Sequence, residues 1–292
     1  MMKKLIFVLI DGLRSDALNR GYSPTLDLLM EKGAFSLEMK TVSPPLTLPA
    51  HFSIFTSLAP YAHGVTTNTG LPDTSALSQS FFTHIKSHGG VVSAFYSWDH
   101  LRNLAPPGVM DLSFYRKNCN ELHLKRLAQE AVRHIVSESP DFCFVYLEWT
   151  DLVGHRSGWM SKEYLNAVQE ADQAVEQIYS AVLSLSEHSE HNGYNLVIQS
   201  DHGGNQKHHF ENIPEIINVP FIAWGPDIGK GRHITSSLSV LDTAPTLAKI
   251  MEIPCHPAWE GRAVTSLFDD GIYEYEYGQI QRLSHALPVL GR

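Results

Sequence analysis

The segment LIFVLIDG, residues 5–12, holds six consecutive apolar residues, Leu5 to Ile10, that are followed directly by Asp11. An apolar, partly β-branched run of this length is typical of a central strand that is covered on both faces. The run ends at Asp11 without a small-residue cleavage site, so we interpret it as a strand rather than as part of a signal peptide. The segment therefore predicts a buried strand with Asp11 at its carboxyl end.

Apolar runs and helical patterns alternate along the rest of the chain. Strands are predicted at residues 91–98, 142–148, 195–199 and 220–224. Helices are predicted from a Ser23 cap with Pro24 at the first position to Gly33, along the apolar face Leu124, Leu127, Ala131 and Ile135, from a Ser161 cap to Leu185, and at residues 240–251. This order predicts an α/β fold with a mainly parallel central sheet and helices on both faces.

Composition sets the broad class of the protein. The 292 residues are 43% hydrophobic, and no linker rich in Pro, Gly or Ser divides them, so we expect a single domain over residues 1–292. A net charge of −9 gives no support for nucleic acid or an anionic membrane as an obligatory partner, and no apolar segment approaches the about 20 residues that cross a bilayer. Three cysteines without a CxxC motif, Cys119, Cys143 and Cys255, predict buried thiols in a reducing compartment, the cytoplasm.

The segment PPLTLPAHFSIFTSLAPYAHGVTTN, residues 44–68, contains the start of another helix. Thr47 stands two residues ahead of Pro49 and just before an apolar run, which is the pattern of a helix N-terminus. A threonine there commonly caps the helix, and the free N–H groups of a helix start also attract phosphate. Thr47 is therefore either a structural cap or part of a phosphate site.

Three aspartates follow the ends of different predicted strands. They are Asp11, Asp151 and Asp201. Because ligands bind outside the carboxyl ends of strands in such sheets, the fold should bring these carboxylates to one edge. His155 follows in DLVGH, and His202, His208 and His209 follow in SDHGGNQKHH. The collection exceeds what one tetrahedral metal site uses and predicts a two-metal centre of the kind that promotes phosphoryl transfer.

At this point the sequence resembles the alkaline phosphatase superfamily, and within it the type I phosphodiesterase/nucleotide pyrophosphatase branch. The resemblance runs over almost the full chain, in the order LIDGLR, SPTLDLLMEKG, LTLPAHFSIFTSLAPYAHG, YLEWTDLVGHRSG, SDHGG, VPFIAWGP, LDTAPTLAKI and WEGR. It implies an alkaline phosphatase-like fold without the large cap insertion of longer members.

The resemblance also implies a ligand set for two divalent ions. One ion would be held by Asp11, Thr47, Asp201 and His202, and the other by Asp151, His155 and His209. The last position is the least defined, and His208, His233 and His256 are the alternatives. Zinc is the first choice because the chain contains 16 histidines, and Mn²⁺ is the alternative.

Further residues match the branch near the nucleophile. Thr47 would be the catalytic nucleophile, and Asn68 would hold a phosphoryl oxygen. Leu48 and Tyr146 match substrate-binding positions, although a core tyrosine is an equally good interpretation of Tyr146. His51 and His63 are not family ligands, so we expect both histidines to pack in the core.

The resemblance implies hydrolysis of a small phosphorylated substrate, such as a nucleotide, through a phosphothreonine. Leu48, Pro49 and Ala50 stand where monoesterases place an arginine, which favours phosphodiesters or pyrophosphates. The alternatives are a phosphomonoesterase, a phosphonoacetate hydrolase-like enzyme that cleaves a C–P bond, and an inactive metal-binding homologue, whereas a sulfatase is disfavoured because its CxPSR block is missing. The aromatic tail with Tyr273, Tyr275 and Tyr277 is either an edge strand or a contact surface for a homo-oligomer.

Overall fold

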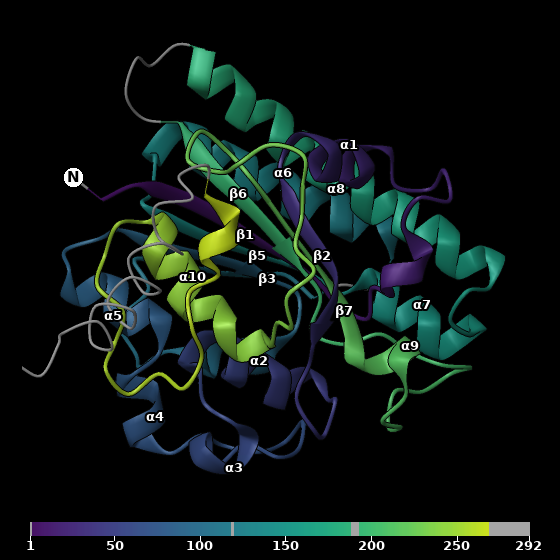
Figure 1. Ribbon diagram of the computed structural model, residues 1–292, viewed down its shortest axis with the longest axis horizontal. Helices are drawn as coiled ribbons and strands as arrows, with labels where there is room; N and C mark the ends of the chain where they lie inside the picture. The colour runs from purple at the N-terminus through teal and green to yellow at the C-terminus, as the bar shows by residue number, and fades with distance from the viewer. Residues whose placement is uncertain (1, 118–119, 188–192, 269–292) are drawn as a thin grey trace, which may run out of the picture.

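The computed structural model describes residues 2–117, 120–187 and 193–268, so Cys119 and the three tail tyrosines lie outside the described residues. Within these ranges, the strands form an eight-stranded sheet (Figure 1). Its spatial order is β4 (Leu112–Tyr115), β3 (Val92–Tyr96), β5 (Phe142–Leu147), β1 (Lys4–Ile10), β6 (Tyr194–Gln199), β7 (Asn218–Trp224), β2 (Ala34–Lys40) and β8 (Arg232–His233).

The sheet is mainly parallel, as predicted. Neighbouring strands from β4 to β6 are parallel, whereas β7 is antiparallel to both of its neighbours, β6 and β2. In the centre, Ile10 pairs with Leu147, and Leu9 pairs with Gln199. The carboxyl ends of β1, β5 and β6 therefore lie at the same level of the sheet, and the aspartates that follow these strands start from one edge.

Both faces of the sheet are covered. Leu5, Phe7 and Leu9 of β1 pack in one core with α2 (Thr47–Thr56), α5 (Phe81–Ser87) and α10 (Thr243–Ile250). Figure 1 shows these three helices on one side of the sheet. The intervening residues Ile6 and Val8 pack in a second core with α1 (Pro24–Lys32), α6 (Glu121–Glu138) and α8 (Lys162–Glu187). Since all of these β1 side chains are buried, the continuous apolar run of the sequence is explained by a strand with two cores.

The predicted helices are present, and shorter elements were missed. The Ser161 hydroxyl accepts a hydrogen bond from the Tyr164 N–H at the start of α8, as the predicted cap requires. Strands β2, β4 and β8 were not predicted, because β4 and β8 lie at the edges of the sheet and β2 is buried only in part, so they lack a continuous apolar run. The remaining helices are α3 (Pro60–His63), α4 (Thr74–Ser78), α7 (Trp149–Ser157) and α9 (Pro214–Ile217), and short 3-10 turns lie at Ser15–Ala17, Asp99–Leu104, Val240–Asp242 and Thr265–Leu267.

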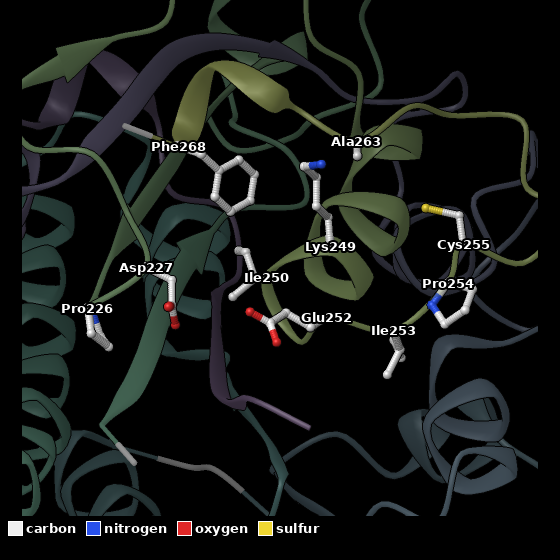
Figure 2. Close-up of a pocket in the computed structure, with 10 residues that line it drawn as sticks. All are labelled: Pro226, Asp227, Lys249, Ile250, Glu252, Ile253, Pro254, Cys255, Ala263 and Phe268. Atoms are coloured by element: carbon white, nitrogen blue, oxygen red, sulfur yellow. The ribbon is translucent and has the colours of Figure 1, made fainter. Parts of the chain in front are cut away.

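The cysteines and the surface agree only in part with expectation. Cys143 is buried, but Cys255 is exposed, so the prediction of a buried thiol is wrong there. Cys255 lines a hollow of about 680 Å³, together with Asp227 and Phe268 (Figure 2). Asp227 follows the reversed strand β7, so this hollow lies at the sheet edge opposite the three aspartates.

Among the described helices, none combines the length and apolar character that a membrane span requires.

The N-terminus of α1 is capped by a residue from another helix. Ser23 occupies the N-cap position, but its hydroxyl contacts the Asp27 carboxylate instead of a backbone N–H. The Asp172 carboxylate of α8 accepts hydrogen bonds from the Thr25 and Leu26 N–H groups, at 3.1 and 2.8 Å. The prediction of a side-chain cap by Ser23 is therefore wrong, and a buried tertiary contact satisfies the helix start.

We expect Asp172→Ala to lower the free energy of unfolding by about 1–2 kcal/mol, because two buried N–H groups lose their acceptor. Urea denaturation measures the change. The neighbouring exposed residue provides the control, since Gln173→Ala should change stability by less than about 0.5 kcal/mol. Equal effects of the two substitutions would contradict the capping role of Asp172.

Candidate active site

The three aspartates that follow β1, β5 and β6 converge at one sheet edge. Asp11 directly follows β1, Asp151 lies in the first turn of α7 after β5, and Asp201 follows Ser200 after β6. The three residues are 1%, 8% and 0% exposed, respectively. The Gly12 N–H donates to Asp201 Oδ1 at 3.2 Å, which links the segments after β1 and β6. The structure thus brings together the carboxylates that the strand ends predicted.

Gly12 makes the close approach of these segments feasible. Its φ is +65°, and a Cβ at this position would lie 3.1 Å from the backbone and side chain of Asp151. A larger residue would meet both a strained backbone and steric overlap. Glycine therefore allows Asp11 and Asp151 to share one small volume.

Each of the three carboxylates keeps one buried oxygen without a hydrogen-bond partner. These atoms are Asp11 Oδ1, Asp151 Oδ1 and Asp201 Oδ2. Burial raises the pKa of Asp11 and of Asp151 well above the ordinary range, and the charge of Asp201 raises each pKa further. Unpartnered buried carboxylate oxygens are costly unless a cation compensates them. The donor set therefore fits divalent metal ions.

Three histidines around the carboxylates share one hydrogen-bonding pattern. In each, Nδ1 contacts a backbone carbonyl, and because a carbonyl can only accept, Nδ1 carries the proton and Nε2 keeps its lone pair. The contacts join His155 to Lys207 O at 2.9 Å, His202 to Gly203 O at 2.9 Å, and His209 to Pro45 O at 2.8 Å. Carbonyl contacts of this kind orient imidazoles that ligate metals.

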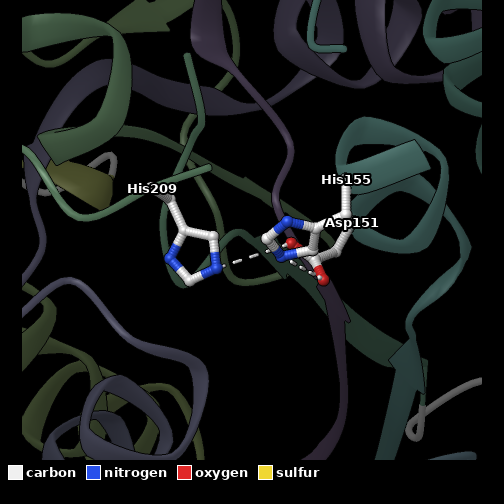
Figure 3. A group of neighbouring side chains, drawn as sticks. All are labelled: Asp151, His155 and His209. Carbon is white, nitrogen blue, oxygen red and sulfur yellow. Dashed lines mark ion pairs between the residues drawn. The ribbon is translucent and has the colours of Figure 1, made fainter. Parts of the chain in front are cut away.

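The free Nε2 atoms point toward the carboxylates in two adjoining groups. Figure 3 shows the first, in which His155 Nε2 lies 3.5 Å from Asp151 Oδ2 and His209 Nε2 lies 4.0 Å from Asp151 Oδ1. In the second, His202 Nε2 lies 3.4 Å from both Asp11 Oδ1 and Asp201 Oδ2. Burial lowers the pKa of His202 and of His209 to about 3, so both rings are neutral at pH 7, as metal ligation requires.

Thr47 reaches the second group from the first turn of α2. Its Oγ1 lies 3.2 Å from His202 Nε2, and the side chain is 5% exposed. Leu46 holds the N-cap position, and its carbonyl accepts from the Ala50 N–H. The interpretation of Thr47 as the capping residue is wrong, because the helix starts one residue earlier and the hydroxyl turns toward His202.

Asn68 and Leu48 are joined beside Thr47. The Leu48 N–H donates to Asn68 Oδ1 at 2.9 Å, so the NH₂ group of Asn68 is left to donate to another acceptor. The Leu48 side chain is 2% exposed and belongs to the hydrophobic core. The role of Asn68 at a phosphoryl oxygen stays a prediction, whereas Leu48 is tied to Asn68 through its backbone and its side chain packs in the core.

Tyr146 occupies a core position in β5. Its hydroxyl donates to Asp11 Oδ2, and its ring is 1% exposed and packs edge-on against His51. A ring with so little exposed area has no face for a substrate, so the geometry favours the core-tyrosine interpretation. His51 and His63 are buried as expected, with hydrogen bonds to Thr47 O and Ser53 Oγ, respectively.

The other histidines considered for the second metal lie elsewhere. The His208 ring is parallel to Phe210, His233 stacks on Phe35 at the β8 edge, and His256 packs near Trp259. None of the three belongs to the candidate metal groups found among the described residues. The structure therefore places His209, the preferred residue, next to Asp151.

Trp159 also contacts this site and was not singled out in the sequence. Its Nε1–H donates to Gly12 O at 2.8 Å, and its ring lies edge-on to His155. Two glycines of the sequence motifs, Gly154 in DLVGH and Gly204 in SDHGG, could have indicated that a large ring packs against them, because they leave room for it.

Known proteins share both the sequence pattern and the fold. The family model described as type I phosphodiesterase/nucleotide pyrophosphatase matches residues 5–220. Venom phosphodiesterase of Macrovipera lebetinus is 26% identical over 227 residues, which cover 69% of this chain and 26% of the relative. Ectonucleotide pyrophosphatase/phosphodiesterase family member 3 of Mus musculus is 25% identical over 222 residues, covering 69% of this chain and 25% of the relative.

The chain thus matches about a quarter of the length of these curated relatives. Human ectonucleotide pyrophosphatase/phosphodiesterase 5 superposes with a TM-score of 0.75 at 15% identity, over 91% of this chain and 100% of that chain, which shows the same alkaline phosphatase-like fold. The match over residues 5–220 includes the converging aspartates, the three histidines and Thr47. The chain belongs to the type I phosphodiesterase/nucleotide pyrophosphatase family.

Proposed function

We propose that this protein is a metal-dependent hydrolase that cleaves phosphodiester or pyrophosphate bonds in a small substrate, with Thr47 as its nucleophile. One observation carries the proposal. Thr47 Oγ1 lies 3.2 Å from His202 Nε2, beside buried carboxylate oxygens that have no hydrogen-bond partner in the protein. A hydroxyl at the start of a helix, next to sites for cations, suits attack on an anionic phosphorus centre.

The cofactors of the proposed enzyme are two divalent ions. Asp11, Thr47, Asp201 and His202 would hold one ion, and Asp151, His155 and His209 would hold the other. Zinc suits three neutral imidazoles with carboxylates, and Mn²⁺ is the alternative. When bound, such ions lower the pKa of a hydroxyl ligand and offset the charge of phosphoryl oxygens.

The chain's own residues then have distinct tasks. The Thr47 hydroxyl loses its proton to solvent, and its oxygen forms a bond to phosphorus while the bond from phosphorus to the leaving oxygen breaks; this produces a covalent phosphothreonine and releases an alcohol or a phosphate, whose oxygen takes up a proton. Water then forms a bond to the same phosphorus while the bond to Thr47 Oγ1 breaks, which releases a phosphate monoester and returns a proton to the Thr47 hydroxyl. The NH₂ group of Asn68, fixed by the bond from Leu48, donates to a non-bridging phosphoryl oxygen.

The surroundings of Thr47 support a diester-type substrate. Leu48, Pro49 and Ala50 are buried and offer no cation for the second charge of a monoester. The names of the relatives refer to phosphodiesterase and nucleotide pyrophosphatase activity, and an inactive variant of murine ectonucleotide pyrophosphatase/phosphodiesterase 5 was solved in complex with AMP. A nucleotide diester or pyrophosphate is therefore the proposed substrate class.

Replacement of the nucleophile separates an enzyme from an inactive metal-binding protein. We expect Thr47→Ala to reduce hydrolysis of bis-(p-nitrophenyl) phosphate by about a thousandfold or more, because no other group occupies the attacking position. Thr47→Ser, which keeps a hydroxyl, serves as the matched control and should retain activity. Metal content measured on all three proteins shows whether the ions stay bound. An unchanged rate in Thr47→Ala would exclude Thr47 as the nucleophile.

Substrate preference tests the assignment to diesters. Zinc-reconstituted protein should have a higher kcat/KM for bis-(p-nitrophenyl) phosphate than for p-nitrophenyl phosphate, since no cation follows Thr47 to bind the additional charge. The same assay with phosphonoacetate tests C–P cleavage. A preference for the monoester or for the phosphonate would overturn the proposed substrate class.

Chelation tests the metal centre through stability. In metal-free protein at pH 8, we expect Asp151→Asn to raise the melting temperature, because it removes one of three repelling buried carboxylates. The folded-state pKa of Asp151 is raised above 3.8 by burial and by Asp201. The loss of folding stability caused by the ionised Asp151 carboxylate is thus absent below the pKa that this group has in the unfolded chain. It grows as pH rises through the higher pKa that the group has in the folded protein. The gain from the substitution should therefore be smaller at pH 5 than at pH 8.

The zinc-loaded proteins provide the control for this measurement. With zinc bound, the wild-type protein should melt higher than Asp151→Asn, because the substitution removes a metal ligand. Thermal denaturation with and without chelator would then give opposite orders of stability. Identical melting temperatures in both conditions for both proteins would show that Asp151 binds no ion.

A further inference from the structure

Trp159 lies in a slot made by two glycines of the candidate site. It follows α7 and is 6% exposed. A Cβ on Gly154 would lie 2.6 Å from the indole ring, and a Cβ on Gly204 would lie 2.1 Å from it. Gly154 stands directly before His155, and Gly204 stands two residues after His202. Both motif glycines thus serve to admit this ring between the two ligand-bearing segments.

The indole contacts two candidate ligands of the first group and a backbone carbonyl beside the second. Its ring lies edge-on to His155, at 5.0 Å between centroids and 83° between planes, and to His209 at 6.0 Å and 71°. Its Nε1–H donates to Gly12 O at 2.8 Å, and the Gly12 N–H in turn donates to Asp201 Oδ1. One rigid side chain therefore supports the imidazoles of the first group and the backbone beside the carboxylates of the second.

The backbone of Trp159 fixes the loop that carries His209. The Trp159 N–H donates to Gln206 O at 2.7 Å, in the segment between His202 and His209. His155 needs such support, since its side chain is 40% exposed and its Nδ1–H donates to Lys207 O in that same segment. Loss of the indole would remove the ring contacts with His155 and His209, whereas the backbone bond to Gln206 O would remain.

From these contacts we infer that Trp159 is a positioning residue that couples the two halves of the metal centre. It touches neither the nucleophile nor the reacting atoms, and it acts by fixing the imidazoles of His155 and His209 and the Gly12 carbonyl beside Asp11. The inference rests on the proposed metal centre. Partners that orient ligating histidines typically change metal affinity by about 10- to 100-fold when they are removed.

A second tryptophan, at the start of α7, provides a matched control. Trp149 of α7 is also 6% exposed, its Nε1–H donates to Glu170 at 2.6 Å, and its ring lies under the Arg156 guanidinium. Trp149→Phe and Trp159→Phe therefore remove the same indole N–H from similarly buried positions. Of these two tryptophans, Trp159 is the one whose ring lies against the candidate ligands His155 and His209.

The test measures zinc affinity of full-length protein by competition with a chromogenic chelator. We expect Trp159→Phe to weaken binding by about 10- to 100-fold and Trp149→Phe to leave it unchanged. Co²⁺ supplies a second measurement, because it quenches the emission of a nearby indole. Quenching should occur in the wild type and in Trp149→Phe and be largely lost in Trp159→Phe. Melting temperatures of the metal-free proteins show whether each variant is folded at the temperature of the assay.

The outcomes distinguish this inference from the proposed function. If the wild type binds two zinc ions and Trp159→Phe binds them equally well, the inference is overturned and the metal centre stands. If the wild type binds no divalent ion, the proposed metal centre fails, and the inference fails with it. Should Trp159→Phe prove unfolded, Co²⁺ quenching in wild type and in Trp149→Phe decides: its absence from both overturns the inference, and its presence in both supports it.

Discussion

Burial of three carboxylates at one edge of the sheet is the constraint on which the site depends. Asp11, Asp151 and Asp201 are each at most 8% exposed, and each keeps an oxygen without a partner. Negative charges in such surroundings repel one another and lose hydration, which raises the pKa of Asp11 and Asp151. The rest of the fold must hold them together, and cations are the natural compensation.

The scaffold meets this constraint with rigid apolar packing. Strands β1, β5 and β6 are buried on both faces and paired in register, so the residues at their carboxyl ends have little freedom to move apart. Backbone carbonyls then bind Nδ1 of His155, His202 and His209, which leaves the Nε2 lone pairs facing the acids. These carbonyl contacts fix the orientation of the rings in the way that suits metal-ligating imidazoles.

The placement of Thr47 follows from the same packing. All ten residues of α2 are buried, so the helix is held firmly against the sheet, and its first turn presents the hydroxyl to His202. The apolar residues after Thr47 serve the core, and this demand leaves no room there for an arginine. Core packing and the proposed preference for a diester would then have a common origin, because buried positions exclude an unpaired cation.

The sequence by itself determined the central strands, the long helices and the aspartates at the strand ends, because apolar periodicity is a local property that burial imposes on each segment. It also indicated the histidines that follow these aspartates, although the choice of His209 rested on the family resemblance. Only the tertiary structure decided the reversed direction of β7, the cap of α1 by Asp172, the burial of Tyr146 and the slot for Trp159. These features depend on contacts between segments distant in the chain, and such contacts leave no periodic pattern in either segment.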